Sequence, residues 1–327
     1  MLDELRTEID RLDEQLLLLL SKRMEVARRI GEAKARGEAP LRDEAREAVV
    51  RGKWLESAAR LGVPASLAEG LLSLVLRESI RSQLRPPRES IAVVGSGRMA
   101  AALLSVLGSS AVSTDFFGEP GLKPCDAFSS SEYIIIATRP SVLGSAAFRE
   151  SLRCASGKVV SDVFSAKGSA FKELESLSQS VGFNYVSLHP LFSGAVDPWE
   201  EVMVVVPSAT SGDALGRVVR LWEGLGFRVV TSDADYHDRA MAVAQVIHHL
   251  YLAALMRALE RASRELGVDY TRFVTHSLKS TLAVAERIMR QPEVVREIQS
   301  TNRYAAIARR LGVEAMKEAA EELGGAS

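Results

Sequence analysis

A glycine-rich turn is the first segment whose residues suggest a chemical role. Gly95-Ser96-Gly97-Arg98-Met99-Ala100 follows the apolar run at 91–95 and leads into a helical stretch. Glycines at this spacing allow a tight turn and a close approach of the backbone to a pyrophosphate, which a helix N-terminus attracts. Asp115 lies 20 residues after Gly95, where a carboxylate binds ribose hydroxyls and repels a 2′-phosphate. The predicted cofactor-binding residues are Gly95, Gly97, Arg98, Met99, Ala100, Asp115 and Thr138.

This spacing predicts NAD as the cofactor, with NADP as the less favoured alternative. Arg98 and Arg139 keep that alternative open, because a guanidinium group binds phosphate well. A glycine-rich turn also occurs in proteins that bind no nucleotide. The strand before it, the helix after it and the acidic residue downstream favour the dinucleotide site.

His189 is a candidate general base. It is one of five histidines and stands at the end of the predicted strand NYVSLHP. Ligands of open α/β sheets bind at the carboxyl ends of the strands, where a histidine can accept a proton. A lone histidine there is more often a packed or capping residue. The segment SDVFSAK at 161–167, which ends the preceding strand, favours the catalytic interpretation.

Charged residues also lie on the apolar face of the first helical segment. At about 100° per residue, Arg23 and Lys34 fall within that face and Arg6 at its edge. Single cations of this kind often reach solvent from the edge of a bundle. Taken together with polar groups on the next two helices, they predict a pocket for a dicarboxylate. Its residues are Arg6, Arg23, Lys34, Asp43, Arg46, Glu47, Ser79 and Gln83.

The separation of Arg6 and Arg23 predicts how this pocket is assembled. At about 1.5 Å per residue they lie roughly 25 Å apart on one straight helix, too far for one small ligand. Either Arg6 is structural, or a second chain supplies it. The second interpretation is favoured and predicts an intertwined dimer.

The pattern of apolar residues predicts three domains. Helical spacing runs from Leu2 to about Ala35, from Pro40 to Gly62 and from Ala65 to Leu84, before the stiff pair Pro86-Pro87. Short β-rich runs then alternate with helices, which is typical of a parallel sheet covered on both faces. The last part is helical. The predicted fold class is multidomain α and α/β, with a three-helix unit at 1–86, a Rossmann-type parallel sheet domain at 90–235 and an all-helical C-terminal dimerisation domain at 236–327.

The predicted elements after residue 90 follow from the same patterns. Strands are expected at 91–95, 133–138, 158–164, 184–190 and 202–207, and helices from Arg239 to Leu266, Thr271 to Met289 and Glu293 to Leu323. The first two of these helices have broad apolar surfaces, which predict a second dimer contact.

Composition narrows the class of partner and the location. The 41 basic and 42 acidic residues give a net charge of −1, which argues against a nucleic-acid partner. The start has no secretory pattern, and no later segment is expected to span a membrane. Cys125 and Cys154 lie too far apart for a CxxC motif, so neither a disulfide framework nor a metal site is predicted. A cytoplasmic enzyme with small-molecule substrates is expected.

Residues 1–86 resemble the all-helical chorismate mutase family at all eight pocket positions. The resemblance implies that Arg23 and Arg46 hold two carboxylates with help from Arg6 of a partner subunit. It also implies that Lys34 and Gln83 donate to an ether oxygen and that Glu47 binds a ring hydroxyl, while Asp43 and Ser79 line the site. Chorismate would rearrange to prephenate without proton transfer.

Residues 90–310 resemble the prephenate dehydrogenase family in the glycine-rich turn, in SDVFSAK, in HPLF at 189–192, in Gln245 to His249 and in Leu282 to Pro292. The resemblance implies that His189 is the base, that Arg287 binds the ring carboxylate of prephenate, and that NAD takes the hydride. Ser165 would hydrogen-bond near His189, and His249 would contact the side chain of prephenate or of a tyrosine feedback inhibitor. Ser193 stands where the family often has glycine. His237 and His276 are predicted to be surface or structural residues.

Both resemblances together imply a bifunctional enzyme of tyrosine biosynthesis that acts as a homodimer. Chorismate and prephenate would be its substrates. Three alternatives remain open: arogenate as the substrate of the dehydrogenase, a helical N-terminal module that is regulatory and inactive, and a generic nicotinamide hydroxy-acid dehydrogenase. The last leaves the first 86 residues unexplained.

Overall fold

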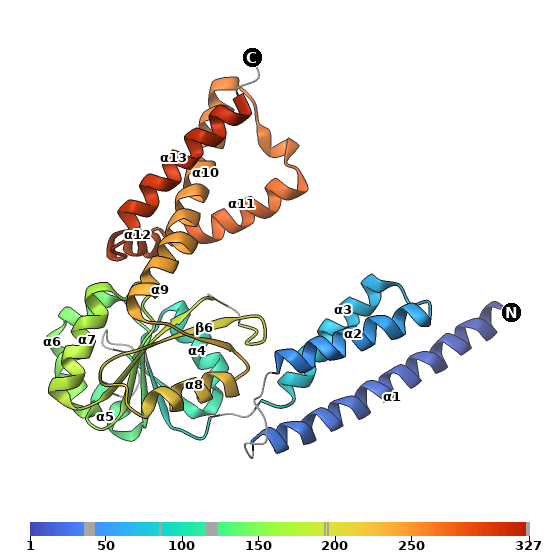
Figure 1. Cartoon of the computed structure of the whole chain (residues 1–327), viewed down its shortest axis with the longest axis horizontal. Coiled ribbons are helices and arrows are strands. Elements are labelled where there is room, and N and C mark those ends of the chain that lie inside the picture. Colours follow the sequence, from blue (N-terminus) through green and yellow to red (C-terminus); the bar gives the residue numbers. More distant parts are fainter. Residues whose placement is uncertain (36–42, 85–86, 116–122, 193, 195, 325–327) are drawn as a thin grey trace. The chain divides into compact units, whose positions relative to one another are not determined.

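The computed structural model describes residues 1–35, 43–84, 87–115, 123–192, 194 and 196–324 (Figure 1). The chain divides into two compact units. One comprises Met1–Thr138, Pro190–Val205 and Asp213–Val230, and the other comprises Arg139–His189, Val206–Gly212 and Thr231–Ser327. The domain boundaries expected from the sequence, at residues 86–90 and 235–236, remain predictions.

Three helices form the N-terminal part, as predicted. They are α1 (Leu2–Ala35), α2 (Glu44–Arg60) and α3 (Ala65–Arg81). Asp43 caps α2 by accepting a hydrogen bond from the backbone N–H of Arg46 at 2.9 Å, so Asp43 precedes the helix instead of lying within it. Pro40, the expected start of this helix, lies outside the described residues. α3 ends three residues earlier than expected, which leaves Gln83 in the turn that follows it.

The apolar residues of this helical part divide between a buried and an exposed set. Leu72 and Val75 of α3 are 0% and 4% exposed, because they face α1 and α2. Along α1 the large apolar side chains are exposed, including Leu5, Ile9 and Leu12. A single chain therefore leaves an apolar stripe of α1 uncovered.

A seven-stranded sheet follows, in the order β2-β1-β3-β4-β5-β6-β7. The pairings of β1 with β2, β1 with β3 and β4 with β5 are parallel, which confirms the predicted sheet type. The strand order reverses at β1, the point at which such sheets bind ligands. The strands are β1 (Ile91–Val94), β2 (Ala111–Thr114), β3 (Tyr133–Ile136), β4 (Val159–Asp162), β5 (Asn184–Pro190), β6 (Val202–Pro207) and β7 (Arg228–Thr231).

Helices lie between successive strands except between β5 and β6, and the residues of β1 and β3 are buried throughout. The connecting helices are α4 (Arg98–Leu107), α5 (Pro124–Ser130), α6 (Ala146–Leu152), α7 (Gly168–Val181) and α8 (Ala214–Gly224). The prediction missed β7, because its four residues have the burial pattern of an exposed edge and form no apolar run.

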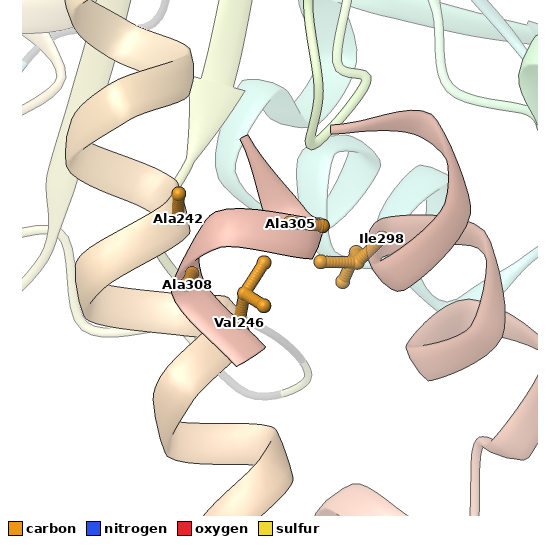
Figure 2. Close-up of a cluster of buried hydrophobic side chains, with 5 residues drawn as sticks. All are labelled: Ala242, Val246, Ile298, Ala305 and Ala308. Atoms are coloured by element: carbon orange, nitrogen blue, oxygen red, sulfur yellow. The ribbon is translucent and has the colours of Figure 1, made fainter. Parts of the chain in front are cut away.

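The C-terminal part is helical, as predicted. It begins with α9 (Ala234–Met241), continues without a break through the π-helical segment Ala242–Ile247 into α10 (His248–Leu266), and ends with α11 (His276–Met289), α12 (Pro292–Thr301) and α13 (Ala305–Gly324). The helix expected from Glu293 to Leu323 is thus two helices. Asn302 separates them, and its side-chain carbonyl accepts from the backbone N–H of Tyr304 at 2.9 Å. Figure 2 shows the core in which α12 and α13 meet the π-helical segment, formed by Ala242, Val246, Ile298, Ala305 and Ala308.

One helix contradicts the expectation that no segment has the character of a membrane span. The continuous helix Ala234–Leu266 is 33 residues long and reaches a mean hydropathy of 1.3, which suffices by length and composition. Ala242 and Val246 of this helix pack into the core of Figure 2. These two residues serve packing between helices, while 22% of the apolar window as a whole is buried.

The cysteines contradict a second expectation. Cys125 and Cys154 are both disulfide-bonded, and no cysteine in the described ranges is free. Sequence spacing excluded a CxxC motif but not a bond between positions that folding brings together. The cysteines therefore give no support for a reducing compartment, although intracellular proteins of hyperthermophiles also carry disulfides.

Replacing both cysteines with serine is expected to lower the free energy of unfolding by about 2–4 kcal/mol, since a disulfide restricts the unfolded chain. Thermal and urea unfolding of the wild type with and without dithiothreitol would measure this. The reduced wild type should match C125S/C154S, and dithiothreitol should not change the variant. Equal midpoints in all four samples would contradict a stabilising disulfide.

Candidate functional site

The glycine-rich turn has the backbone that the sequence predicted. Gly95 follows β1 with a φ of 129°, which only glycine adopts without strain. A Cβ atom on Gly95 would lie 2.6 Å from the carbonyl oxygen of Ala137. The backbone N–H of Gly95 donates to the carbonyl of Thr114 at 2.9 Å. The ends of β1, β2 and β3 are thus packed backbone to backbone.

The next residues fit the pyrophosphate of a dinucleotide. Gly97 caps α4, and a Cβ there would meet no atom within 4 Å, so the space before the helix N-terminus is open to a ligand. Ala100 is fully buried, as close packing of helix on strand requires. Arg98 is exposed and Met99 is half-buried on the first turn. This arrangement attracts a phosphate.

The predicted ribose contacts lie at the same edge. Thr114 and Val94 are register partners in β2 and β1, so Asp115 and Gly95 follow neighbouring strand ends. Thr138 comes two residues after β3 and is half-buried. Arg139, considered as a phosphate ligand, forms an ion pair with Glu293 at 2.5 Å. This pair occupies its guanidinium and weakens the case for a bound 2′-phosphate.

His189 lies at the end of β5 and is 3% exposed. Its Nδ1 is 2.9 Å from Nε2 of His237, and Nδ1 of His237 is 3.1 Å from Oδ1 of Asp238. The three side chains therefore form a row, carboxylate to imidazole to imidazole. His237 is 2% exposed, so it is not a surface residue, and of the two predicted roles only the structural one stays open.

Asp238 determines the protonation of this row. Its Oδ1 and Oδ2 accept from the backbone N–H groups of Lys167 and Gly168 at 2.8 and 3.0 Å. A carboxylate only accepts hydrogen bonds, so Nδ1 of His237 carries the proton that it donates to Asp238. Nε2 of His237 is then an acceptor, and Nδ1 of His189 donates to it. This leaves the Nε2 lone pair of His189 for a substrate.

Burial keeps both imidazoles neutral. Desolvation lowers the pKa of His189 well below 6.5, and electrostatic interaction with His237 and Lys167 lowers it further. Desolvation also lowers the pKa of His237, against the hydrogen bond to Asp238, which raises it. At neutral pH His189 is therefore an unprotonated base.

A buried lysine supports the strand that carries His189. Lys167 is 1% exposed, and its Nζ donates to the carbonyls of Leu188 and Phe164 at 2.6 and 2.7 Å and pairs with Asp162 at 3.4 Å. Asp162 also accepts from the hydroxyls of Tyr185 and Ser187, each at 2.5 Å. The segment SDVFSAK thus forms a polar cluster beneath the site.

Asn302 is a supporting residue that the sequence left unassigned. It is 3% exposed, and its Nδ2 donates to the carbonyl of Asp238 at 2.8 Å. The dipeptide His237-Asp238 in α9 is a sequence feature that could have indicated this part of the site. The role of this dipeptide depends on His189, which lies 48 positions before His237.

The other predicted dehydrogenase residues are not all brought to His189. Ser165 is half-buried on the loop after β4, and no hydrogen bond of its hydroxyl is found within the described part of the chain. Arg287 is exposed in the last turn of α11. His276 is exposed, as expected, and Ser193 lies outside the described residues.

His249 is buried on α10, at 8% exposure. Desolvation, with a contribution from His248, lowers its pKa to about 4. Its Nδ1 and Oε1 of Gln245, one turn earlier, have no hydrogen-bond partner among the described residues. Buried polar atoms of this kind are available to a ligand.

In the helical part, Arg23 reaches α3. Its Nη1 donates to Oγ of Ser79 and lies 3.4 Å from the carbonyl of Val75. Ser79 is 6% exposed, and Nε2 of Gln83 donates to its carbonyl at 2.9 Å. The structure therefore brings together Arg23, Ser79 and Gln83, as the sequence predicted.

Lys34 is half-buried and lies within electrostatic reach of two carboxylates. Desolvation lowers its pKa, and the charges of Asp43 and Glu47 raise it. Arg46 is exposed at the start of α2. Arg6 is exposed and pairs with Asp3 at 3.2 Å, so one chain alone does not bring Arg6 to the other pocket residues.

Removing the acceptor of His189 tests the row of side chains. His237→Leu is expected to lower the dehydrogenase kcat about 10- to 100-fold, since a hydrogen bond that orients a charged state contributes about 1.5–3 kcal/mol. His237→Gln, whose amide oxygen can still accept, should lose less. Steady-state kinetics at pH 7 with thermal melting of both variants would measure this. Equal kcat values for both variants would mean that His237 only fills space.

Comparisons with known proteins agree with both parts of this description. Residues 5–84 match the family described as chorismate mutase type II. The T-protein of Enterobacter agglomerans is 26% identical over 276 residues, which cover 82% of this chain and 73% of that protein. The T-protein of Haemophilus influenzae is 24% identical over 263 residues, covering 76% and 67%.

Solved structures share the fold of the later residues. A prephenate dehydrogenase from A. aeolicus, in complex with hydroxyphenyl propionate and NAD+, has a TM-score of 0.57 at 19% identity and covers 72% of this chain and 91% of its own. A putative prephenate dehydrogenase from Corynebacterium glutamicum has a TM-score of 0.59 at 17% identity, with 73% and 84% covered.

A dinucleotide turn, a buried base at a strand end and a separate helical pocket define a nicotinamide-dependent dehydrogenase joined to a second enzyme. The helical part matches the type II chorismate mutase family over residues 5–84. Over 82% of its length the chain is similar to a T-protein, and the fold of its later residues is that of solved prephenate dehydrogenases.

Proposed function

We propose that the chain rearranges chorismate to prephenate in its helical part and then oxidises and decarboxylates prephenate to 4-hydroxyphenylpyruvate, with NAD as the oxidant. The observation that carries the second step is the row Asp238–His237–His189, which leaves Nε2 of His189 as a neutral base. The Arg23–Ser79 contact carries the first step, because it places a cation in the interior beside Gln83.

The mutase residues act on charge and conformation. Arg23 and Arg46 hold the two carboxylates of chorismate, and Lys34 and Gln83 donate to the ether oxygen as its bond breaks. Glu47 accepts from the ring hydroxyl, and Asp43 and Ser79 line the pocket. Such fixed donors stabilise the developing negative charge without reorganisation.

The dehydrogenase residues move one proton and position one carboxylate. His189 takes the hydroxyl proton of prephenate through Nε2, Arg287 binds the ring carboxylate, and Ser165 and His249 bind other polar groups of the substrate. NAD, when bound, accepts the hydride. Loss of carbon dioxide then leaves an aromatic ring, which makes the reaction strongly downhill.

The glycine-rich turn and Asp115 would hold the cofactor. The positive φ of Gly95 and the open space at Gly97 leave room for a pyrophosphate at the N-terminus of α4. Arg98, Met99, Ala100 and Thr138 complete this site, and Asp115 would bind ribose hydroxyls. The ion pair of Arg139 with Glu293 favours NAD over NADP.

We also propose that the enzyme is a homodimer in which Arg6 of each chain completes the mutase pocket of the other. The exposed apolar stripe of α1 supports this assembly. Large exposed side chains on α10 and beyond, among them Tyr251 and Phe273, support a second contact. His249 would bind tyrosine as a feedback inhibitor, and the enzyme would act in the cytoplasm.

Mixing two inactive variants tests the shared pocket. If Arg6 acts in the partner's pocket, R6A and R23A subunits should recover about a quarter of the wild-type mutase sites after subunit exchange, since each mixed dimer has one intact pocket. R23A mixed with R46A should recover none. No recovery in the first mixture would assign Arg6 to a structural role.

The overall proposal is tested by mixing the protein with chorismate and NAD and measuring NADH by absorbance. NADH from chorismate is the expected result. NADH from prephenate alone would make the helical part a regulatory module, and NADH only from arogenate would change the second substrate. No NADH from any of the three would contradict the dehydrogenase.

A further inference from the structure

Two small residues occupy the buried face of α1 between its two pocket cations. Ala27 is 5% exposed, and Gly31 is buried. They follow Arg23 at intervals of four residues, so Arg23, Ala27 and Gly31 lie on one face, with Lys34 close to it. α1 therefore contacts α3 along the stretch between Arg23 and Lys34, the two cations that it contributes to the proposed mutase pocket.

Gly31 is the point of closest approach. A Cβ atom built on it would lie 2.8 Å from Cβ of Gln83 and 2.9 Å from both its Cα and its Cγ. The Cα belongs to the backbone, so rotating the glutamine side chain cannot relieve the overlap. A glycine deep inside a long helix weakens that helix, and this contact gives a reason for its presence.

We infer that Gly31 is a positioning residue for the mutase reaction, acting through Gln83. This inference rests on the proposed chorismate mutase function. Any side chain at position 31 would push the turn after α3 away from α1. The amide of Gln83 would then shift relative to Arg23, and errors of about 1 Å in such placement can cost on the order of 10²-fold in rate.

Two other glycines provide matched controls. Gly52 lies inside α2 and Gly70 inside α3, and a Cβ on either would meet nothing within 4 Å. Alanine at these positions should improve the helix without disturbing the pocket. G31A, G52A and G70A therefore make the same chemical change in three helices, and only in G31A would the added Cβ overlap a neighbouring residue.

The experiment measures mutase kcat and KM for the full chain, with dehydrogenase activity on prephenate as the internal reference. G31A is expected to lower mutase kcat about 10- to 100-fold with a smaller change in KM, while its dehydrogenase kcat stays at the wild-type value. G52A and G70A should keep both activities. In a Q83A background, G31A should cost little further, because its effect acts through Gln83.

Wild-type mutase kcat in G31A would overturn the assignment. The assignment would also be overturned if G31A lowered mutase kcat as much in the Q83A background as in the wild type. The same holds if mutase kcat in G31A fell only in proportion to the helix content measured by circular dichroism. Absence of mutase activity in the wild type would instead contradict the proposed function, so the two failures are distinguishable.

Discussion

Replacing His189 with asparagine is expected to lower the dehydrogenase kcat by about 10²–10⁴-fold, the usual contribution of a positioned general base. Asparagine keeps a polar group at the end of β5 but cannot accept a proton at neutral pH. NADH formation from prephenate measures the loss. The mutase rate of the same variant should not change, because none of the mutase residues contacts His189 or His237 through the described hydrogen bonds.

The pH profile separates loss of a base from loss of structure. Burial lowers the pKa of His189 well below 6.5, so its base form persists as the pH falls. The acid limb of wild-type kcat/KM should therefore lie below pH 6.5, and His189→Asn should lose that limb. His276→Asn, a change at an exposed histidine, is the control and should keep the wild-type profile. A limb that survives in His189→Asn would assign the base to another residue.

Local features of this chain could be predicted from its sequence. The bounds of α1, β5 and β6 match the predicted segments, because each has an unbroken apolar pattern. The glycine-rich turn was also predictable, since Gly95 needs its conformation for backbone reasons alone. The cations of the helical pocket were found because charges on an apolar face are unusual.

Features that depend on distant residues could not be predicted. The pairing of His189 with His237 joins positions 48 apart, and neither residue alone indicates the other. The disulfide state of Cys125 and Cys154 likewise depends on tertiary distance. Arg6 is a different case. The helix length predicted that Arg6 and Arg23 of one chain cannot contact the same small ligand, and the exposed position of Arg6 in the single chain agrees with that argument.

Replacing Arg23 with alanine is expected to lower mutase kcat/KM by at least about 10²–10³-fold. Arg23 donates to Ser79 within the interior and loses solvent there, which lowers its pKa without removing its charge. In the proposed pocket this cation meets a carboxylate of chorismate away from water, where a single well-placed donor contributes on this scale. The measurement is the disappearance of chorismate at substrate concentrations below KM.

Two further measurements test this prediction: a control variant on the same helix, and the addition of prephenate, the product of the first reaction. Arg28→Ala changes an exposed arginine of α1 and should keep the mutase rate. In Arg23→Ala, added prephenate should restore NADH formation to the wild-type rate, because the second site needs only the product of the first. If prephenate failed to restore it, Arg23 would act on the stability of the whole chain. If chorismate were consumed normally, the pocket would lie elsewhere than between α1 and α3.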